Sequence, residues 1–266
     1  MNITAIILTA VVVCAVGLIV GVLLVTADQK FKVEVDEKEI AVRAELPGNN
    51  CGGCGYPGCD GLAAAIAKGE APVNQCPVGG APVAAKIAAI MGTEAGESVK
   101  KVAYVHCSGT CEAAKEKGVY YGIEDCRSAA AIPGGGSKAC RFGCKGLGSC
   151  VKACEFDAIH VINGVAVVNR KKCMACGKCV AVCPNHLIEL IPDSAPYTVG
   201  CASQDKAKAV MEVCSAGCIG CTACTKVCEH DAIHMNGNIP VYDYEKCTGC
   251  GKCAEKCPKK AIKKRS

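Results

Sequence analysis

The spacing of the cysteines constrains this chain more than any other feature of its sequence. The chain has 26 cysteines among 266 residues, against 3 Phe, 7 Tyr and no Trp. Few large rings are therefore available for a core, and small domains with so much cysteine are held together by disulfides or by metals. The spacing of the thiols distinguishes between these two possibilities.

Two segments of the chain repeat each other at an offset of 74 residues. The residues around the cysteines repeat as well, because Cys154-Glu-Phe-Asp-Ala-Ile-His corresponds to Cys228-Glu-His-Asp-Ala-Ile-His. Eight cysteines at one offset indicate a duplicated module. The first copy contains Cys140, Cys144, Cys150, Cys154, Cys173, Cys176, Cys179 and Cys183, and the second contains Cys214, Cys218, Cys224, Cys228, Cys247, Cys250, Cys253 and Cys257.

Each copy ends in the run C-x2-C-x2-C-x3-C-P, from Cys173 to Pro184 and from Cys247 to Pro258. In bacterial ferredoxins the first three cysteines of this run hold one [4Fe-4S] cluster and the fourth ligates the other cluster. The second copy repeats the spacing from Cys218 to Cys228, with Glu229 in place of proline. The run therefore predicts two cross-ligated sites, namely site 4 (Cys218, Cys221, Cys224 and Cys257) and site 5 (Cys247, Cys250, Cys253 and Cys228).

The first copy departs from this pattern, because Leu147 stands where Cys221 would align. Three thiols are still needed beside the one that crosses over, and Cys140 remains to supply the missing one. The predicted sites are site 2 (Cys140, Cys144, Cys150 and Cys183) and site 3 (Cys173, Cys176, Cys179 and Cys154). The alternative for site 2 is an incomplete three-iron cluster, to which Cys140 would not contribute.

A different motif precedes the modules, at Cys51-Gly-Gly-Cys54-Gly-Tyr-Pro-Gly-Cys59, and Cys76 follows it. The glycines beside the first two cysteines let the backbone turn sharply and leave amide N–H groups free to point at cluster sulfurs. Structural zinc also takes four cysteines, but usually as two closely spaced pairs. Three ligands in one loop and one apart favour a [4Fe-4S] cluster over zinc. We call this group site 1 (Cys51, Cys54, Cys59 and Cys76).

Six cysteines lie outside these five sites. Cys14 lies in an apolar run and is most simply a small apolar residue. The others are either buried thiols or ligands of one further cluster, an alternative that the similar spacings of Cys126 to Cys140 and Cys201 to Cys214 keep open. They are Cys107, Cys111, Cys126, Cys201 and Cys214. The cofactors expected are thus five [4Fe-4S] clusters, with a further one left open.

A long apolar run begins the sequence, since residues 3–25 contain no charge. As a helix this run would extend about 35 Å, which exceeds the roughly 30 Å core of a bilayer. A cleaved signal peptide is the alternative, because Val25-Thr26-Ala27 resembles a cleavage site, but no Lys or Arg precedes the run. Lys30 and Lys32 follow it, which predicts a single-pass protein of the cell (inner) membrane with its remainder in the cytoplasm. A reducing cytoplasm also disfavours disulfides.

The predicted fold class is α+β, with an N-terminal transmembrane helix, a small helical Fe-S domain and two tandem modules that resemble bacterial ferredoxin. The predicted divisions are a transmembrane anchor (1–27), a linker (28–46), a [4Fe-4S] domain (47–80), a connecting segment (81–137), module 1 (138–192), a second connecting segment (193–212) and module 2 (213–266).

Several classes of function are excluded by what the sequence does not contain. It has no G-x-G-x-x-G after a strand, no P-loop and no pairing of a nucleophile with a base, so no catalytic residue is predicted. A net charge of +5 without basic-aromatic stripes argues against nucleic acid as a partner. The histidines are scattered and are expected at the surface or beside ligands: His106, His160, His186, His230 and His234.

The end of the chain is basic, and it has two interpretations. It is either a surface for an acidic soluble ferredoxin or anionic lipid, or a solvated tail. The residues concerned are Lys256, Lys259, Lys260, Lys263, Lys264 and Arg265.

Taken in order, the anchor, the site 1 motif, the segment Tyr104-Val-His-Cys-Ser-Gly and the two modules resemble the B subunit of the Rnf complex, the ion-translocating ferredoxin:NAD oxidoreductase of bacteria. The resemblance covers nearly the whole chain and is most specific at residues 46–77 joined to an N-terminal membrane helix. A second ferredoxin module is a departure from the shorter members of the family.

The resemblance implies that this chain is an electron-transfer subunit of a membrane translocase. Its implied partners are soluble ferredoxin, the membrane and the other Rnf subunits, which carry the NAD site, the flavins and the ion path. Two alternatives remain open, namely a membrane-anchored polyferredoxin that serves another oxidoreductase and a zinc-rich structural adaptor.

Overall fold

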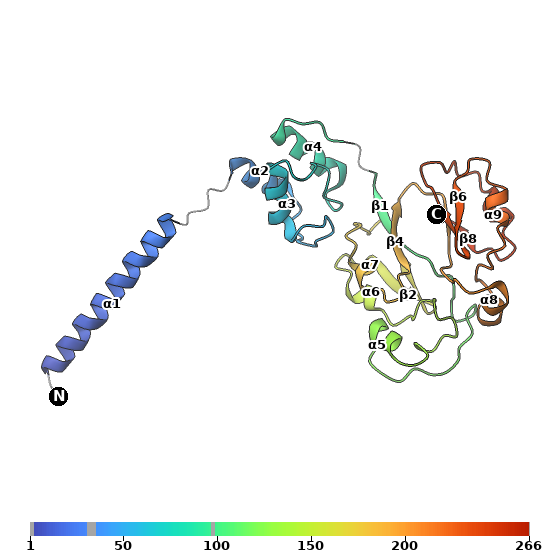
Figure 1. Ribbon diagram of the computed structural model, residues 1–266, viewed down its shortest axis with the longest axis horizontal. Helices are drawn as coiled ribbons and strands as arrows, with labels where there is room; N and C mark the ends of the chain where they lie inside the picture. Colours follow the sequence, from blue (N-terminus) through green and yellow to red (C-terminus); the bar gives the residue numbers. More distant parts are fainter. Residues whose placement is uncertain (1–2, 31–35, 97–98, 266) are drawn as a thin grey trace.

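The computed structural model of the protein describes residues 3–30, 36–96 and 99–265 (Figure 1). Its helices are α1 (Ile3–Lys30), α2 (Glu37–Glu45), α3 (Gly58–Ala67), α4 (Gly80–Met91), α5 (Cys126–Ala131), α6 (Ser149–Lys152), α7 (Lys178–Val182), α8 (Ala207–Val213), α9 (Ala223–Lys226) and α10 (Lys252–Glu255). Its strands are β1 (Lys101–Val105), β2 (Ile159–Ile162), β3 (Val165–Val168), β4 (Ile188–Pro192), β5 (Tyr197–Val199), β6 (Ile233–Asn236), β7 (Ile239–Tyr242) and β8 (Ile262–Lys264).

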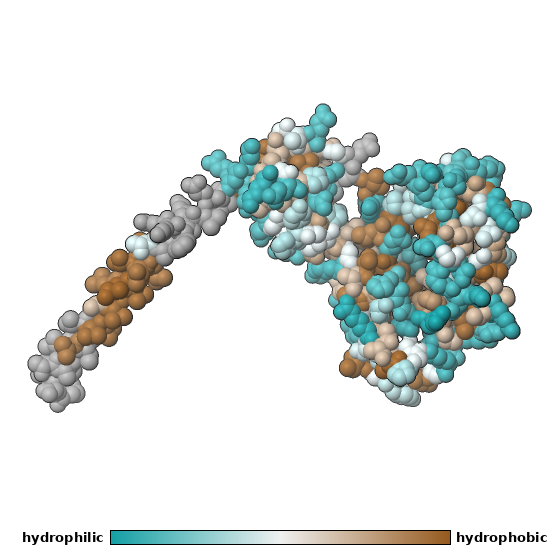
Figure 2. Space-filling model, viewed as in Figure 1, coloured by the Kyte–Doolittle hydropathy of each residue, from teal (hydrophilic) through white to brown (hydrophobic). Residues whose placement is uncertain are grey.

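Helix α1 extends away from the rest of the chain and exposes apolar side chains such as Val12, Leu18 and Leu24 (Figures 1 and 2). Over the residues that the structure describes, no helix has the combined length and hydropathy needed to cross a membrane. The transmembrane anchor predicted for residues 1–27 is therefore not supported, although α1 occupies its place in the sequence.

Helices α2, α3 and α4 form a small domain around site 1. Asp36 caps α2 by accepting a hydrogen bond from the amide of Lys38 at 2.9 Å. Val42 of α2 is fully buried with Leu62 of α3 and Ile87 of α4. The linker predicted for residues 28–46 is thus wrong from residue 36 onward, because the apolar residues of this stretch recur at helical spacing and pack into the core. Residues 31–35 of that linker lie outside the described residues.

Each ferredoxin-like module consists of an inner hairpin and an outer strand pair. The hairpins are β2–β3, with Ile162 opposite Val165, and β6–β7, with Asn236 opposite Ile239. The outer pairs are β1–β4 and β5–β8. Throughout the described part of the chain the sheets are two-stranded and antiparallel. The connecting segments predicted at 81–137 and 193–212 therefore supply an outer strand to module 1 and to module 2.

Local sequence explains the tight turns of module 1. Asn163 and Gly164 join β2 to β3 with φ values of 50° and 75°, the left-handed conformation that a two-residue hairpin turn requires. Gly177 precedes α7 with a φ of 77°, which glycine adopts without steric strain. This turn places Cys179 on the short helix α7, and Cys183 follows at its end.

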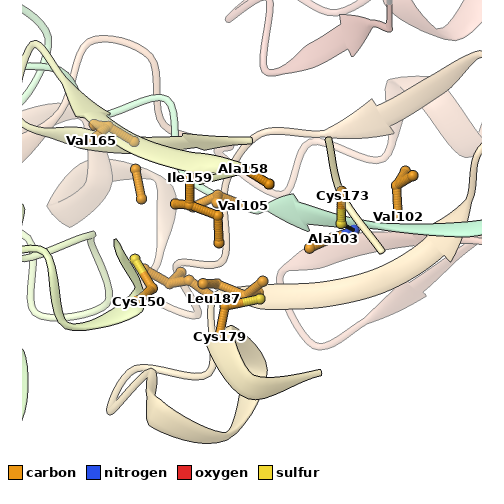
Figure 3. Close-up of a cluster of buried hydrophobic side chains, with 12 residues drawn as sticks. Val102, Ala103, Val105, Cys150, Ala158, Ile159, Val165, Cys173, Cys179 and Leu187 are labelled. Carbon is orange, nitrogen blue, oxygen red and sulfur yellow. Dashed lines mark hydrogen bonds between the residues drawn. The ribbon is translucent and has the colours of Figure 1, made fainter. Parts of the chain in front are cut away.

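The core of module 1 is small and contains thiols among its aliphatic side chains. Val102, Ile159 and Leu187 are almost fully buried, and Figure 3 shows Cys150 and Cys179 beside Leu187. Since burial of one aliphatic side chain contributes about 2 kcal/mol, a core of this size leaves much of the stability to whatever binds the cysteines.

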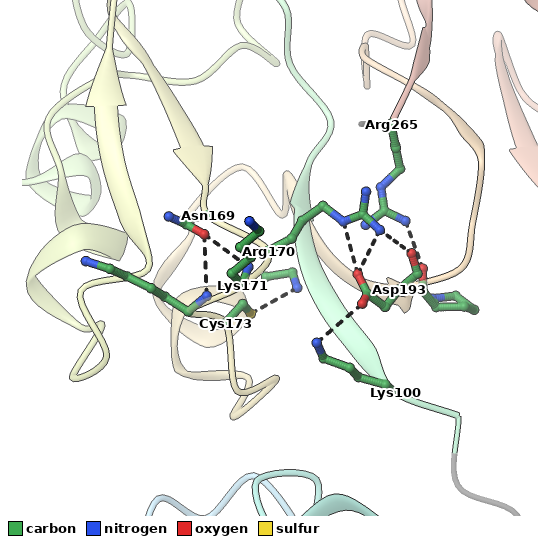
Figure 4. Close-up of polar contacts among 10 residues, drawn as sticks. Lys100, Asn169, Arg170, Lys171, Cys173, Asp193 and Arg265 are labelled. Atoms are coloured by element: carbon green, nitrogen blue, oxygen red, sulfur yellow. Dashed lines mark hydrogen bonds and ion pairs between the residues drawn. The ribbon is translucent and has the colours of Figure 1, made fainter.

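Polar contacts join the two modules at the end of β4. Asp193 pairs with Lys100 at 3.3 Å and with Arg170 at 2.9 Å (Figure 4). Arg265, which follows β8, donates hydrogen bonds to the carbonyl oxygens of Pro192 at 2.8 Å and Ala195 at 3.1 Å. Arg265 is therefore a residue of this junction and not part of a solvated tail.

Candidate iron-sulfur cluster sites

All 26 cysteines of the chain are free thiols. In module 2 the structure brings together both groups that the sequence predicts. One cavity is lined by the four cysteines of site 4, which are Cys218, Cys221, Cys224 and Cys257. A second cavity is lined by the four cysteines of site 5, which are Cys228, Cys247, Cys250 and Cys253. The last cysteine of each run thus crosses to the other group, as in bacterial ferredoxins.

The crossing cysteines receive the same backbone contact in both modules. The amides of Ala261 and Ala232 donate to the Sγ atoms of Cys257 and Cys228 at 3.3 and 3.4 Å. In module 1 the amides of Leu187 and Ala158 donate to the Sγ atoms of Cys183 and Cys154, each at 3.4 Å. Each donor lies four residues after its acceptor, and such N–H groups stabilise the negative charge of a cluster-bound thiolate.

The other three cysteines of site 3 lie near the buried thiol of Cys179. Burial, and after it the neighbouring thiols of Cys173, Cys176 and Cys154, raise the pKa of Cys179 to about 12. The amide of Ala103 in β1 donates to Cys173 Sγ at 3.3 Å. The outer strand of module 1 therefore contributes directly to the surroundings of site 3.

Site 1 is held by the loop that precedes α3 and by the turn that precedes α4. Cys54, Cys59 and Cys76 pack in one cluster of the small domain. Asn50 accepts a hydrogen bond from the amide of Cys59 at 2.8 Å, and the amide of Gly79 donates to Cys76 Sγ at 3.3 Å. Cys51, the remaining member, lies beside Cys176 of site 3, whose pKa is raised by burial and further by the thiol of Cys51.

At site 2 the structure brings together a group of cysteines that differs in one member from the predicted group. Its cavity is lined by Cys144, Cys150 and Cys183 as predicted, but the fourth cysteine is Cys126. The amide of Cys126 donates to Ser149 Oγ at 2.7 Å, and this contact places α5 beside Cys150. Cys140 lines another cavity, together with Cys107, Cys201 and Cys214. The structure therefore places Cys126, and not Cys140, beside the other three cysteines predicted for site 2.

The repeat could not identify Cys126, because Gly200 stands 74 residues further on and module 2 has no equivalent cysteine. The only signal was the similar spacing of Cys126 to Cys140 and of Cys201 to Cys214. That spacing pointed to additional ligands without showing which site each would join.

The donor sets fit [4Fe-4S] clusters in their chemistry. A [4Fe-4S] cluster takes one thiolate at each of its four irons, and the cavities of sites 2, 4 and 5 are each lined by four thiols. Burial raises the pKa of Cys150 to about 12 and of Cys224 to about 11, so these thiols lose their protons readily only when a metal takes the proton's place. Among the described side chains of His, Cys, Asp and Glu, no group of three or more is arranged to hold a single metal ion, whereas a [4Fe-4S] cluster distributes its four thiolates over four irons.

Two histidines line cavities together with these cysteines, because His230 lines the cavity of site 5 and His106 lines the cavity of Cys107, Cys140, Cys201 and Cys214. His160 and His234 occupy equivalent positions in the two modules and pair with Asp157 at 3.4 Å and Asp231 at 3.8 Å. His106 lies between the carbonyl oxygen of Val199 at 2.8 Å and the carboxylate of Glu189 at 3.0 Å. These contacts agree with the surface role predicted for the two exposed histidines and give His106 a role in joining β1, β4 and β5.

Three family models match the regions that contain these cysteines. Residues 46–78 match a family described as an Fe-S cluster domain. Residues 166–189 match the 4Fe-4S binding domain, and residues 217–261 match the 4Fe-4S dicluster domain.

Several curated proteins are similar to this chain over nearly its whole length. The B subunit of the Na(+)-translocating ferredoxin:NAD(+) oxidoreductase complex of Acetobacterium woodii is 48% identical, over 92% of this chain and 74% of that protein. The B subunit of the ion-translocating oxidoreductase complex of Methanosarcina acetivorans is 42% identical, over 96% of both chains. The B subunit of the proton-translocating ferredoxin:NAD(+) oxidoreductase complex of Clostridium ljungdahlii is 39% identical, over 97% and 92%. The chain therefore belongs to the family of B subunits of the ion-translocating oxidoreductase (Rnf) complexes.

Proposed function

We propose that this chain carries single electrons between soluble ferredoxin and the other subunits of an ion-translocating ferredoxin:NAD oxidoreductase. The names of its relatives and the matches to 4Fe-4S families support this role. The observation that carries it is that thiols of successive groups lie near one another, because electron transfer needs each site to lie close to the next. When bound, [4Fe-4S] clusters supply one-electron chemistry, at potentials set by hydrogen bonds and solvent exposure.

The ligand groups that we assign to five [4Fe-4S] clusters follow the cavities and contacts described above. Sites 1, 3, 4 and 5 keep their predicted cysteines, and site 2 takes Cys126 in place of Cys140. The assigned groups are Cys51, Cys54, Cys59 and Cys76; Cys126, Cys144, Cys150 and Cys183; Cys154, Cys173, Cys176 and Cys179; Cys218, Cys221, Cys224 and Cys257; and Cys228, Cys247, Cys250 and Cys253.

Cysteines of successive sites are neighbours in the structure. Cys51 of site 1 neighbours Cys176 of site 3, and Cys150 of site 2 neighbours Cys179 of site 3. In module 2, Cys224 of site 4 and Cys253 of site 5 belong to one core cluster. The order of sites is therefore 1, 3, 2 on one side of the junction and 4, 5 on the other.

Module 2 is the end that we assign to soluble ferredoxin. Cys221 of site 4 and Cys250 of site 5 are exposed, so a partner can approach these two sites closely. Lys259 lines the cavity of site 4, and Lys260 lies next to it on an exposed part of the chain. A basic rim around an exposed cluster attracts an acidic redox protein and raises its rate of association.

Helix α1 is the part of the chain that we assign to attachment at the membrane complex. Its described side chains from Val12 to Val25 are exposed and largely apolar, which in water is unfavourable for a helix of this length. The free thiols elsewhere suit a reducing compartment, so we assign the cysteine-rich part to the cytoplasmic face. A chain lacking residues 1–30 should then leave the membrane fraction and keep its iron. Retention of that chain at the membrane would contradict this assignment.

The proposed function is tested by reducing the purified full-length chain with reduced ferredoxin under anaerobic conditions. Rapid bleaching of the visible absorption is expected, with a rate that falls as salt rises. Replacing Lys259 and Lys260 by Gln should lower the rate roughly three- to tenfold at low salt, because rim charges act on association. Lys208→Gln, an exposed lysine on α8, is the matched control. Absence of any bleaching by reduced ferredoxin would contradict the proposed function.

A further inference from the structure

We propose that Cys107, Cys140, Cys201 and Cys214 hold a sixth [4Fe-4S] cluster, which connects the two modules; this inference rests on the proposed function. These four cysteines line a single cavity at the junction of the modules. Cys107 and Cys140 come from module 1 and the segment before it. Cys201 and Cys214 come from the segment that precedes site 4. None of them belongs to the five sites assigned above.

The four thiols form two equivalent pairs. Cys140 and Cys214 correspond at the 74-residue offset of the repeat. Cys107 and Cys201 each lie two residues after the end of an outer strand, because β1 ends at Val105 and β5 ends at Val199. The duplication therefore presents the same two positions from both modules to one cavity, and the tetrad arises only where the two copies meet.

Backbone amides approach these thiols in the same symmetric way. The amide of Cys144 donates to Cys107 Sγ at 3.3 Å, and the amide of Cys218, its equivalent in the repeat, bonds to Cys201. Cys201 Sγ also accepts from the amide of Ser203 at 3.5 Å, and Cys107 accepts from the amide of Gly109 two residues further on. Paired N–H donors of this kind are typical of cluster thiolates.

The loop that follows Cys107 holds Cys214 in position. The amide of Lys115 donates to the carbonyl of Val213 at 2.9 Å, and the amide of Ser215 donates to the carbonyl of Ala113 at 2.8 Å. A Cβ atom at Gly109 would lie 3.5 Å from Cys107 Sγ and 3.7 Å from Cys214 Sγ. The thiols of these two cysteines therefore border the same space, which glycine leaves open.

A buried lysine lines this cavity and points to an anionic occupant. Lys138 is 5% exposed, and its Nζ donates to the carbonyl oxygens of Gly109 and Gly164, each at 2.6 Å. Among the described residues no carboxylate forms an ion pair with Lys138. A buried ammonium without an opposite charge is strongly unfavourable, and a cluster with four thiolates carries the negative charge that would balance it.

The tetrad lies between site 2, the last of sites 1, 3 and 2, and site 4, the first of sites 4 and 5. Cys144, which donates to Cys107, is a ligand of site 2. Cys218, whose amide bonds to Cys201, is a ligand of site 4. The full order becomes 1, 3, 2, 6, 4, 5, so that an electron can cross the whole chain by short steps. Six groups of four also account for 24 of the 26 cysteines and leave only Cys14 and Cys111.

The test is the content of iron and acid-labile sulfide in the full-length chain, purified anaerobically. The double variant Cys201→Ala/Cys214→Ala removes two ligands, so it cannot keep a cluster at this site. We expect about 24 irons in the native chain and about 20 in the variant, with sulfide falling in parallel. Cys111→Ser removes an exposed thiol outside the six groups and should keep about 24.

The outcomes separate this inference from the proposed function. About 20 irons in the native chain would overturn the sixth site while leaving the electron-transfer role intact, and this count does not depend on how a variant folds. An equal iron content in the native chain and the double variant would overturn it as well. One zinc beside about 20 irons would show that the tetrad binds an ion and not a cluster. A native chain without iron would instead overturn the proposed function itself.

Discussion

Gly53 lies against the backbone of Cys176, so that a Cβ atom at position 53 would be 2.6 Å from the carbonyl oxygen of Cys176. Gly53 stands between Cys51 and Cys54, which we assign to site 1, and Cys176 is one of the cysteines that we assign to site 3. This close approach is how the small N-terminal domain meets module 1. Only glycine permits it, since a side chain at this position would overlap backbone that has no freedom to turn away.

The first prediction is that Gly53→Ala slows electron transfer between site 1 and site 3. The added methyl group must push the loop of site 1 away from Cys176, and electron transfer falls steeply with distance. We expect the iron content to stay unchanged, while site 1 is reduced at least several-fold more slowly in rapid-mixing experiments. Gly118→Ala is the control, because a Cβ atom there has no neighbour within 4 Å. Equal rates in the two variants would contradict the role of this contact.

The second prediction concerns the potential of site 5. The hydroxyl of Tyr242 donates to Cys253 Sγ at 3.5 Å, and burial raises the pKa of Tyr242, which keeps this group protonated. A donor to a thiolate favours the more negative, reduced cluster, so Tyr242→Phe should make the potential of site 5 more negative by about 30 to 60 mV.

Its matched control is Tyr244→Phe. The Tyr244 ring stacks on Tyr242 with centroids 5.9 Å apart, but its hydroxyl bonds to Thr198 at 2.9 Å and not to a cysteine. A spectroscopic redox titration should therefore show a shift for Tyr242→Phe alone. Equal shifts in both variants would assign the effect to ring packing.

The third prediction is a loss of stability at high pH through Tyr104. Burial raises the pKa of Tyr104 to about 12, against an ordinary value of 10. Between these two pH values the unfolded chain releases a proton that the folded chain retains, so the free energy of unfolding falls as pH rises. The stabilisation associated with the protonated Tyr104 is therefore complete below pH 10 and lost by about pH 12.

Replacing Tyr104 by Phe removes the titrating hydroxyl, so the unfolded chain no longer releases this proton in that pH window. Urea unfolding across that pH window should then show a shallower decline, by on the order of 2 kcal/mol. Tyr121→Phe is the control, because Tyr121 is 90% exposed. An unchanged decline in the Tyr104 variant would contradict the prediction.

The fourth prediction concerns Asp125, which positions Cys126 for site 2. Asp125 accepts hydrogen bonds from the amide of Ser128 at 2.8 Å and from Ser149 Oγ at 2.7 Å, and the first of these lowers its pKa most. Asp125→Ala removes the cap of α5, which contributes about 1 kcal/mol, and frees the segment that begins with Cys126. An iron chelator should then extract about four irons faster from this variant than from the native chain.

Asp125→Asn is the matched variant, because asparagine also caps helices. It should release iron at nearly the native rate. If the Ala and Asn variants behaved alike, the charge of Asp125 and not its capping geometry would determine the stability of site 2.

The repeat in the sequence was sufficient to predict which thiols meet in module 2, and it failed where the two copies differ. Sites 4 and 5 depend on spacing within one cysteine run and on one crossing residue, both of which a sequence displays. Cys126 reaches site 2 through α5 and Ser149, and module 2 has no counterpart for it. Cys107 and Cys201 meet because outer strands pair across long stretches of chain, which no local spacing encodes.

The same reasoning applies to the N-terminal part of the chain. Residues 36–46 were predicted as the second part of a linker. Val42 nevertheless packs against α3 and α4, since tertiary burial outweighs a polar average. The charge of Arg265 was likewise visible in the sequence, whereas its contact with Pro192 depends on the pairing of β8 with β5.

The central claim, that these thiols hold iron-sulfur clusters for electron transfer, is tested most directly by elemental composition. Iron, acid-labile sulfide and zinc should be measured in one sample of the anaerobically purified full-length chain. The account predicts about 24 irons and about 24 sulfides per chain with little zinc. Zinc in near-stoichiometric proportion to the sites, without sulfide, would contradict the electron-transfer role.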